Sequence, residues 1–144
     1  MIIISHRGNL FGPDRKNENR PEQIKKALKE KLDVEIDVWL MKKKWFLGHD
    51  KPEYRVSKKF LENPRLWCHA KNRNALTEMI ANKKVHCFWH EKDLYTITSK
   101  NIIWVYPGRK TCKNSVLVSK GPRLAKGRML GVCTDFPIRY RQST

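Results

Sequence analysis

The sequence lacks the patterns that would place it in several large structural classes. No apolar run approaches the ~20 residues that a membrane-spanning helix needs. Residues 1–5 are too short for a signal-peptide core and carry no basic segment. Internal repeats, linkers and low-complexity tracts are also missing. We therefore expect a single domain over residues 1–144 that works in the cytoplasm as a monomer, with no transmembrane segment.

Cysteine is scarce, and its spacing argues against a common kind of metal site. The four cysteines lie at positions 68, 87, 112 and 133, and none forms the C-x-x-C pair of a zinc knuckle. Cys68, Cys87 and Cys133 fall in apolar runs. Their positions predict buried thiols in a protein of a reducing compartment.

Acidic residues are also few, because 14 Asp and Glu stand against 31 Lys and Arg, for a net charge of +17. Such an excess favours an anionic partner, whether nucleic acid, a phospholipid headgroup or a phosphorylated metabolite. The basic residues are scattered and no standard nucleic-acid-binding motif is present, so nucleic acid is the less favoured of these. A hydrophobic content of 40% with five tryptophans argues against a disordered chain.

Two of the few acids lie together in the run of residues 32–40. Glu35 and Asp37 alternate there with β-branched residues, and this alternation is typical of a strand. Both carboxylates then share one face of the strand, and the apolar residues share the other. A solvated sheet face would produce the same pattern, so the pair becomes a candidate site only together with its neighbours.

Two histidines follow neighbouring apolar runs. His6 comes after residues 2–4, and His49 comes after residues 45–47. In parallel α/β folds the chemistry gathers at the C-terminal ends of the strands. The two histidines and the two acids are therefore expected to meet at one end of a parallel sheet.

The sequence pattern predicts mainly strands, joined by short connections. A helix is expected to open at residues 18–22, with Pro21 in its first turn, and a second over residues 73–82, capped near Asn72. Residues 95–98 are ambiguous. Strands are expected at residues 2–4, 32–40, 45–50, 66–71, 85–90, 102–106, 115–118 and 130–135.

Eight strands with few helices predict an α/β fold, a small (β/α)8 TIM-type barrel with reduced outer helices. The first strand, helix and strand form a βαβ unit, whose crossover is right-handed in nearly all proteins. The chain has 144 residues, well short of the ~250 of a full barrel. The ring of outer helices is therefore expected to be incomplete.

Four short motifs stand in order along the chain: His6-Arg7-Gly8, Glu18-Asn19, Glu35-x-Asp37 and His49-Asp50. In order and approximate spacing they resemble the pattern of the glycerophosphodiester phosphodiesterase family. Residues 132–137, with a T-D-x-P ending, resemble that family's closing strand. The superfamily also contains the phosphatidylinositol-specific phospholipases C and the spider-venom phospholipases D.

The resemblance implies a (β/α)8 barrel that cleaves a small phosphodiester with the help of a divalent metal. It implies that His6 and His49 are the catalytic acid–base pair. Glu35 and Asp37 would hold the metal, Mg²⁺ or Ca²⁺. Arg7 would contact the phosphate, where a guanidinium can form two parallel hydrogen bonds.

Further residues are expected around this site. Glu18 would lie at its edge and orient Arg7 or a histidine. Trp39, on the same strand face as Asp37, is expected to form a wall of the pocket. The family supplies a third metal carboxylate in an E-x-K motif on the fourth strand, and the matching segment here is His69-Ala70-Lys71.

That replacement leaves three alternatives open for the metal. His69 is a ligand, or water takes its place, or the metal is held loosely, because hard cations prefer oxygen ligands. A histidine ligand also shifts preference toward transition metals. We favour a site-lining role for His69, while Lys71 adds positive charge for the phosphate. The remaining histidines of the aromatic run, His86 and His90, are expected to be structural or edge-exposed.

The sequence supports several functional hypotheses. The first is a metal-dependent phosphodiester hydrolase that acts on glycerophosphodiester-like substrates through histidine acid–base catalysis. If the first nucleophile is a hydroxyl of the substrate itself, the same site is a lyase that yields a cyclic phosphate. The others are a catalytically weakened barrel that binds a phosphorylated ligand, and a nucleic-acid-binding barrel.

Overall fold

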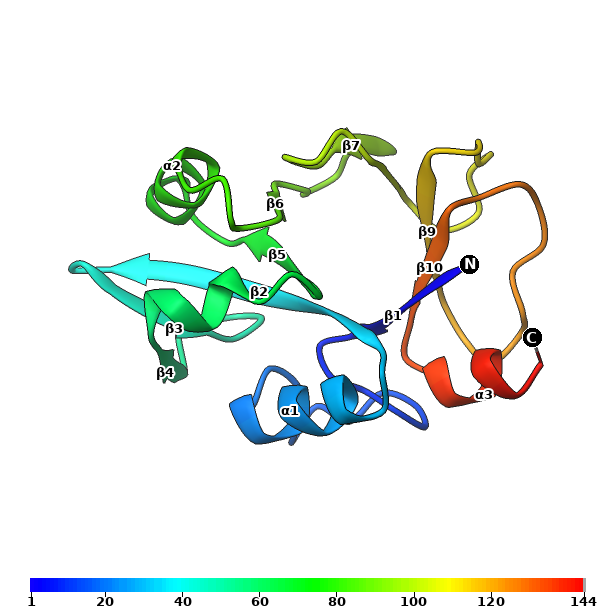
Figure 1. The fold of residues 1–144 in the computed structure, drawn as a ribbon, viewed down its shortest axis with the longest axis horizontal. Helices are drawn as coiled ribbons and strands as arrows, with labels where there is room; N and C mark the ends of the chain where they lie inside the picture. The colour runs from blue at the N-terminus through cyan, green and yellow to red at the C-terminus, as the bar shows by residue number, and fades with distance from the viewer. Residues whose placement is uncertain (144) are drawn as a thin grey trace.

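Strand β1 (Ile2–His6) lies in the middle of the sheet and joins its two halves (Figure 1). It pairs in parallel with β2 (Asp33–Met41) on one side and with β10 (Gly131–Thr134) on the other. The computed structural model describes residues 1–143, and ten strands of that part of the chain form one sheet. The apolar residues of β1 suit this central position, since both of its edges are paired.

The other elements are short. The remaining strands are β3 (Lys44–Leu47), β4 (Tyr54–Val56), β5 (Leu66–Ala70), β6 (Cys87–Phe88), β7 (Tyr95–Ile97), β8 (Ile103–Val105) and β9 (Ser115–Ser119). The helices are α1 (Pro21–Lys29), α2 (Arg73–Ala81) and α3 (Pro137–Gln142), with one 3-10 helix, η1 (Lys58–Glu62).

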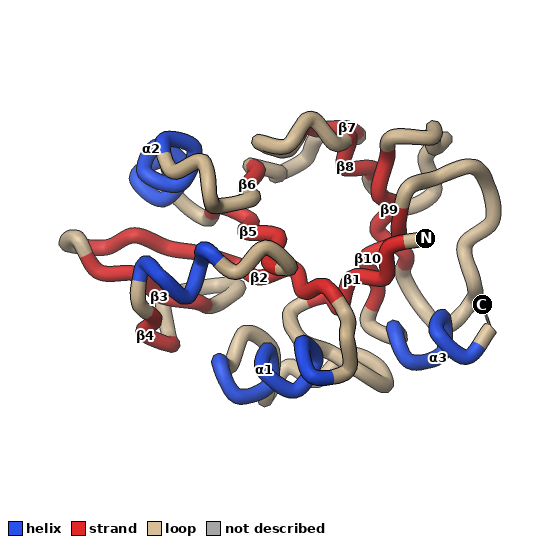
Figure 2. Tube along the Cα trace, viewed as in Figure 1, coloured by secondary structure: helices blue, strands red, loops and turns tan. Residues whose placement is uncertain are grey.

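The strands curve around a common interior. Neighbours run parallel in the order β6, β5, β2, β1, β10, β9 and β8, and Figure 2 shows them arranged around a ring. The hairpin of β3 and β4 extends antiparallel from β2, and β7 lies antiparallel to β8. No strand pairing joins β6 to β8 within residues 1–143. There the backbone N–H of Ser99 donates to the carbonyl of Cys87 over 2.8 Å.

The expectation of a (β/α)8 TIM-type barrel is wrong. The sheet is mixed, its ladder is open between β6 and β8, and residues 1–143 contain only three short α-helices. Only α1 and α2 connect parallel strands, since α3 follows the last strand. The loops that join β8, β9 and β10 contain Pro107-Gly108 and Gly121-Pro122, which do not continue a helix. The architecture is a curved half-barrel.

The third expected strand shows why the all-parallel interpretation failed. Only Lys42 and Lys43 separate β2 from β3, and both have positive φ angles, 47° and 62°. A two-residue connection joins antiparallel strands, because a parallel crossover needs a dozen or more residues. β3 therefore folds back along β2, with Leu47 opposite Val38. The sequence also does not predict β4, leaves β7 ambiguous and overestimates the length of β6.

Side chains alternate across the curved sheet and build two cores. On the outside, Val34, Ile36 and Val38 of β2 are fully buried against α1 and α2. On the inside, six strands each contribute one buried side chain: Ile4, Trp67, Phe88, Trp104, Val116 and Cys133. Burial of a large apolar side chain contributes ~1.5–3 kcal/mol. The same alternation turns Glu35 and Asp37 of β2 toward the interior.

Several local predictions are confirmed. Helix α1 begins at Pro21, and the side chain of Asn72 caps α2 by accepting the backbone N–H of Ala75 at 2.9 Å. None of the helices within residues 1–143 combines the length and the apolar character that crossing a membrane requires. The three cysteines of the apolar runs are buried: Cys68, Cys87 and Cys133.

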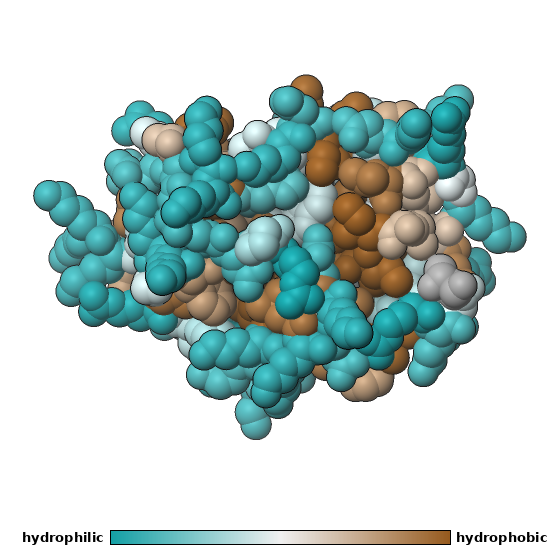
Figure 3. All heavy atoms as spheres, in the orientation of Figure 1, coloured by the Kyte–Doolittle hydropathy of each residue, from teal (hydrophilic) through white to brown (hydrophobic). Residues whose placement is uncertain are grey.

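The surface is strongly polar. Figure 3 shows hydrophilic side chains over most of the displayed face and one group of apolar side chains over β1, β8, β9 and β10. Loops rather than helices join β8 to β9 and β9 to β10 in this region.

The buried histidine His86 makes the stability of the fold sensitive to acid. Its Nε2 lies 2.7 Å from the hydroxyl of Thr98, and its ring packs against Trp67. Burial, together with the charge of Lys100, lowers the pKa of His86 from 6.5 to about 4. Between these two values the unfolded chain binds a proton that the folded chain does not. The free energy of unfolding should therefore fall as pH drops through this range, by up to ~3 kcal/mol.

Denaturant unfolding of the wild-type protein and of His86→Gln, between about pH 7 and about pH 4, measures how much His86 contributes to the pH dependence of the free energy of unfolding. Glutamine keeps a hydrogen-bonding group beside Thr98 and cannot titrate. The wild-type protein should lose stability relative to the variant as pH falls. Parallel pH profiles would contradict the assignment.

Candidate functional site

The predicted acids and histidines meet inside the half-barrel. His6 lies opposite Glu35 in the register of β1 and β2, and Asp37 lies opposite His69 in the register of β2 and β5. Asp135 directly follows β10, which pairs with β1 on its other side. The parallel register thus places these side chains at one mouth of the curved sheet.

Asp37 is the centre of this site, and its side chain is fully buried. Asn19 holds it in place: Nδ2 donates to Oδ2 at 2.9 Å, and Oδ1 accepts the backbone N–H of Asp37 at 2.9 Å. Burial alone would raise the pKa of Asp37, but His49, His69 and Arg7 hold it well below its usual range. Four nitrogens surround the carboxylate: Arg7 Nε at 3.0 Å, His69 Nδ1 at 3.2 Å, His49 Nδ1 at 3.3 Å and Lys71 Nζ at 3.7 Å.

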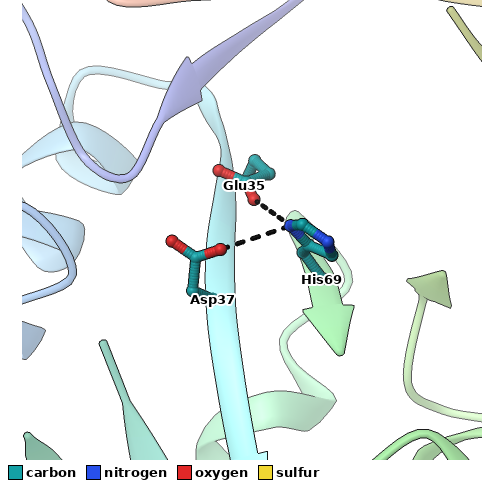
Figure 4. Close-up of side chains that lie close together, drawn as sticks. All are labelled: Glu35, Asp37 and His69. Atoms are coloured by element: carbon teal, nitrogen blue, oxygen red, sulfur yellow. Dashed lines mark ion pairs between the residues drawn. The ribbon is translucent and has the colours of Figure 1, made fainter. Parts of the chain in front are cut away.

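His69 of β5 faces both acids of β2 (Figure 4). Its Nδ1 is 3.2 Å from Asp37 Oδ1 and 3.5 Å from Glu35 Oε1. Its Nε2 donates to the carbonyl of His90 at 2.7 Å, and its ring stacks on Phe88. Burial would lower the pKa of His69, but the two carboxylates raise it to about 9. In this arrangement His69 is an imidazolium paired with both acids.

His6 is oriented by an acid of the last strand. Its Nδ1 lies 2.7 Å from Asp135 Oδ1, which leaves Nε2 facing Glu35 Oε2 at 3.8 Å. Burial opposes protonation, yet Asp135 and Glu35 together raise the pKa of His6. The hydrogen bonds from His6 and Asn9 lower the pKa of Asp135 against its burial. The contact with Asp135 sets which ring nitrogen of His6 faces the site.

Arg7 is held by acids on two sides. Its NH1 lies 3.1 Å from Glu18 Oε2, and its Nε lies 3.0 Å from Asp37 Oδ2. Although burial disfavours the charge, Asp37, Glu35 and Glu18 raise the pKa of Arg7 above its usual value. Glu18 also accepts a hydrogen bond from Asn9 at 3.0 Å. Glu18 therefore positions Arg7 rather than a histidine.

His49 reaches the site because β3 runs back along β2. The backbone N–H of Gly48 donates to the carbonyl of Asp37 at 3.2 Å, which brings His49 beside that residue. Gly48 has a φ of 152°, and a Cβ there would lie 2.0 Å from the carbonyl oxygen of Lys51. Only glycine fits this turn.

Trp39 takes part in the turn that positions His49. Its indole N–H donates to the carbonyl of Gly48 at 2.6 Å. The nearby cleft, about 370 Å³ in volume, is lined by other residues: Arg7, Arg15, Glu18, Asn19, His49, Asp50, Lys51 and Glu53. Through its hydrogen bond to Gly48, Trp39 thus helps to fix the position of the adjacent His49.

Three polar residues of the site were not singled out from the sequence. Asp135 pairs with His6, Asn9 bridges Glu18 and Asp135, and Asn19 holds Asp37. Two of them lie in the motifs quoted above, the E-N pair and the T-D-x-P ending. These motifs are the signal that could have assigned them a role.

The donor set at the acids fits a divalent cation. One ligand atom from each of Glu35, Asp37 and His69 can be chosen so that all three lie within 4.8 Å of one another. Glu35 Oε2 and Asp37 Oδ1 are buried and lack hydrogen bonds of good geometry. The two carboxylates are ligands of the kind that Mg²⁺ and Ca²⁺ prefer, whereas the imidazole nitrogen is more typical of a transition-metal site. His69 must also lose its proton to join them.

Comparisons with known proteins add no relative, because no protein-family model, curated protein or solved structure matches this chain. The chemistry of the site must therefore carry any functional conclusion.

Replacing Asp37 should strongly destabilise the fold. In Asp37→Asn the cations around it would lose their buried counter-charge, and breaking a buried ion pair from one side costs ~3–5 kcal/mol. Denaturant unfolding near neutral pH measures the change. Asp50→Asn is the matched control, since Asp50 is exposed at the rim beside His49 and should leave stability unchanged. Equal stability of the two variants would contradict this account of Asp37.

Proposed function

We propose that this protein is a metal-dependent phosphodiesterase that cleaves small glycerophosphodiester-like molecules. The observation that carries the proposal is the placement of two imidazoles on one pair of acids. His6 Nε2 lies 3.8 Å from Glu35 Oε2, and His49 Nδ1 lies 3.3 Å from Asp37 Oδ2. A phosphate over the acid pair would lie between two groups able to transfer protons near neutral pH. The resemblance of the four motifs supports the same reaction.

Positive charge for the phosphate comes from Arg7 and Lys71. Glu18 and Asp37 fix the Arg7 guanidinium, and its NH2 lies 3.5 Å from His49 Nε2. A guanidinium held in this way binds two phosphate oxygens, while the Lys71 ammonium adds a point charge. Because these groups are held in place before substrate binds, they stabilise developing charge without reorganisation.

The two histidines divide the proton transfers. One removes the proton of the attacking hydroxyl or water, and the other protonates the leaving oxygen. Asp135 holds Nδ1 of His6 and so keeps its Nε2 turned toward Glu35. Asp37 contacts Nδ1 of His49, which leaves the Nε2 of His49 beside Arg7 NH2. A Mg²⁺ or Ca²⁺ ion bound by Glu35 and Asp37 would neutralise charge on the phosphate oxygens.

The nucleophile decides the product. Water yields a linear phosphomonoester, and a neighbouring hydroxyl of the substrate yields a cyclic phosphate; phosphorus NMR of the reaction distinguishes them. We place this activity in a cytoplasmic monomer, and the four free cysteines support the reducing compartment.

Removing either histidine tests the proposal. With glycerophosphocholine or an aryl phosphodiester and added Mg²⁺ or Ca²⁺, His6→Ala and His49→Ala should each lower kcat/KM by at least ~10²-fold. His86→Gln serves as the matched control, because this histidine lies below the site and contacts Trp67 and Thr98. Binding of metal and of glycerophosphocholine without turnover by the wild-type protein would instead indicate a half-barrel that only binds phosphorylated ligands.

A carboxylate in place of His69 should strengthen metal binding. In His69→Glu three acids face one another, so Mg²⁺ or Ca²⁺ should bind about 10-fold more tightly or better, measured by calorimetry and by the shift in Tm on adding metal. His69→Gln is the control that adds an oxygen but no charge. Chelation should abolish turnover in the wild-type protein. An unchanged metal affinity of His69→Glu would contradict the assigned metal position.

A further inference from the structure

The half of the mouth opposite the acids has no role in the reaction described above. Inward-facing positions continue there by the alternation of the strands. Phe88, Trp104 and Val116 face the interior core. The next inward position beyond Phe88 is His90, the next beyond Trp104 is Tyr106, and Val118, which also packs on that core, is followed by Lys120. We name His90, Tyr106 and Lys120 the distal wall.

A continuous series of contacts links the distal wall to the acids. His69, which pairs with both acids, lies 6.2 Å from His90 between ring centres. The rings of His90 and Tyr106 are 6.1 Å apart. The Lys120 ammonium lies over the Tyr106 ring, 5.5 Å from its centre. The wall therefore lies at the same mouth as the acids and extends away from them.

The distal wall also carries an unused polar atom. Within residues 1–143, four buried side-chain nitrogen or oxygen atoms lack a hydrogen bond of good geometry, and all belong to this mouth: Arg7 Nε, Glu35 Oε2, Asp37 Oδ1 and His90 Nδ1. Buried polar groups are normally hydrogen-bonded, so a buried atom without a hydrogen bond is a candidate for contact with a ligand. The three atoms at the acids still take part in ion pairs, with Asp37, His6 and His69 respectively. His90 Nδ1 is therefore the atom of this group that a ligand in the distal wall would satisfy.

The charge of the wall selects the ligand. A cation already lies on the Tyr106 face, the surface that a trimethylammonium group would otherwise use. Lys120 is exposed at the rim and can reach a ligand. The nearby acid Asp93 keeps its negative charge while it accepts a hydrogen bond from the backbone N–H of Glu91, but the charge that lies on the ring face of the wall is that of Lys120. A negatively charged substituent gains from Lys120, and a positively charged one is repelled.

We propose that the distal wall binds one arm of the phosphodiester and selects substrates whose arm carries a negative charge over those whose arm carries a quaternary ammonium. This inference rests on the proposed function. It narrows the substrate class from glycerophosphodiesters in general to those with an anionic alcohol. Lys120 acts as a specificity residue, because it contacts the arm and not the phosphorus.

Three chromogenic esters test the inference. Each is a 4-nitrophenyl phosphodiester, with 2-carboxyethyl, propyl or choline as the second alcohol. The wild-type protein with Mg²⁺ or Ca²⁺ should prefer the carboxyethyl ester over the propyl ester, and the propyl ester over the choline ester, by about 5-fold at each step at low salt. The differences should lie in KM rather than kcat and shrink at high salt.

Variants at the rim decide whether Lys120 is responsible. Lys120→Ala should bring the three esters within about 2-fold of one another, and Lys120→Glu should reverse their order. Lys126→Ala, an exposed lysine of the same loop, should keep the wild-type order. Cleavage with equal preference, or an unchanged order in Lys120→Glu, would overturn this inference alone. If no ester is cleaved by the wild-type protein, the proposed function fails and the inference fails with it.

Discussion

A fully buried carboxylate, that of Asp37, constrains more of this molecule than any other side chain. Removing a carboxylate from water costs several kcal/mol unless cations and hydrogen bonds replace the water. The replacements come from separate parts of the chain: Asn19 before α1, Arg7 after β1, His49 after β3, and His69 with Lys71 at β5. The charge of one acid thus ties the first half of the fold to a single arrangement.

The interior of the half-barrel is divided into an apolar and a polar layer. Trp67, Phe88 and Trp104 fill the middle, and the next inward residues toward the C-terminal ends of the strands are polar. The apolar layer keeps water away from the acids from below, so the ion pairs around them act in a medium of low dielectric. The same layer supports His69, whose ring stacks on Phe88.

The helices are distributed unevenly around the curved sheet. Helices α1 and α2 cover β2 and β5, which carry the acids and His69, while loops connect the strands of the other half. Those loops leave their polar residues at the mouth, and the distal wall comes from that half. A chain of 144 residues thereby keeps a rigid support behind the acids and a polar, accessible surface facing them.

Local chemistry was readable from the sequence alone, because it depends on neighbouring residues. The alternation around Glu35 and Asp37 placed both acids on one strand face, Asn72 marked the start of α2, and the motifs named most of the residues that surround Asp37.

Tertiary structure decided which side chains meet and where the sheet stays open. The two-residue turn at Lys42 and Lys43 is local and makes β3 antiparallel, but the contact of His49 with Asp37 exists only once β3 has paired with β2. The pairing of His6 with Asp135 joins residues 129 positions apart. Such contacts follow from which strands pair and in which register, and strand pairing is a long-range choice that local periodicity does not encode.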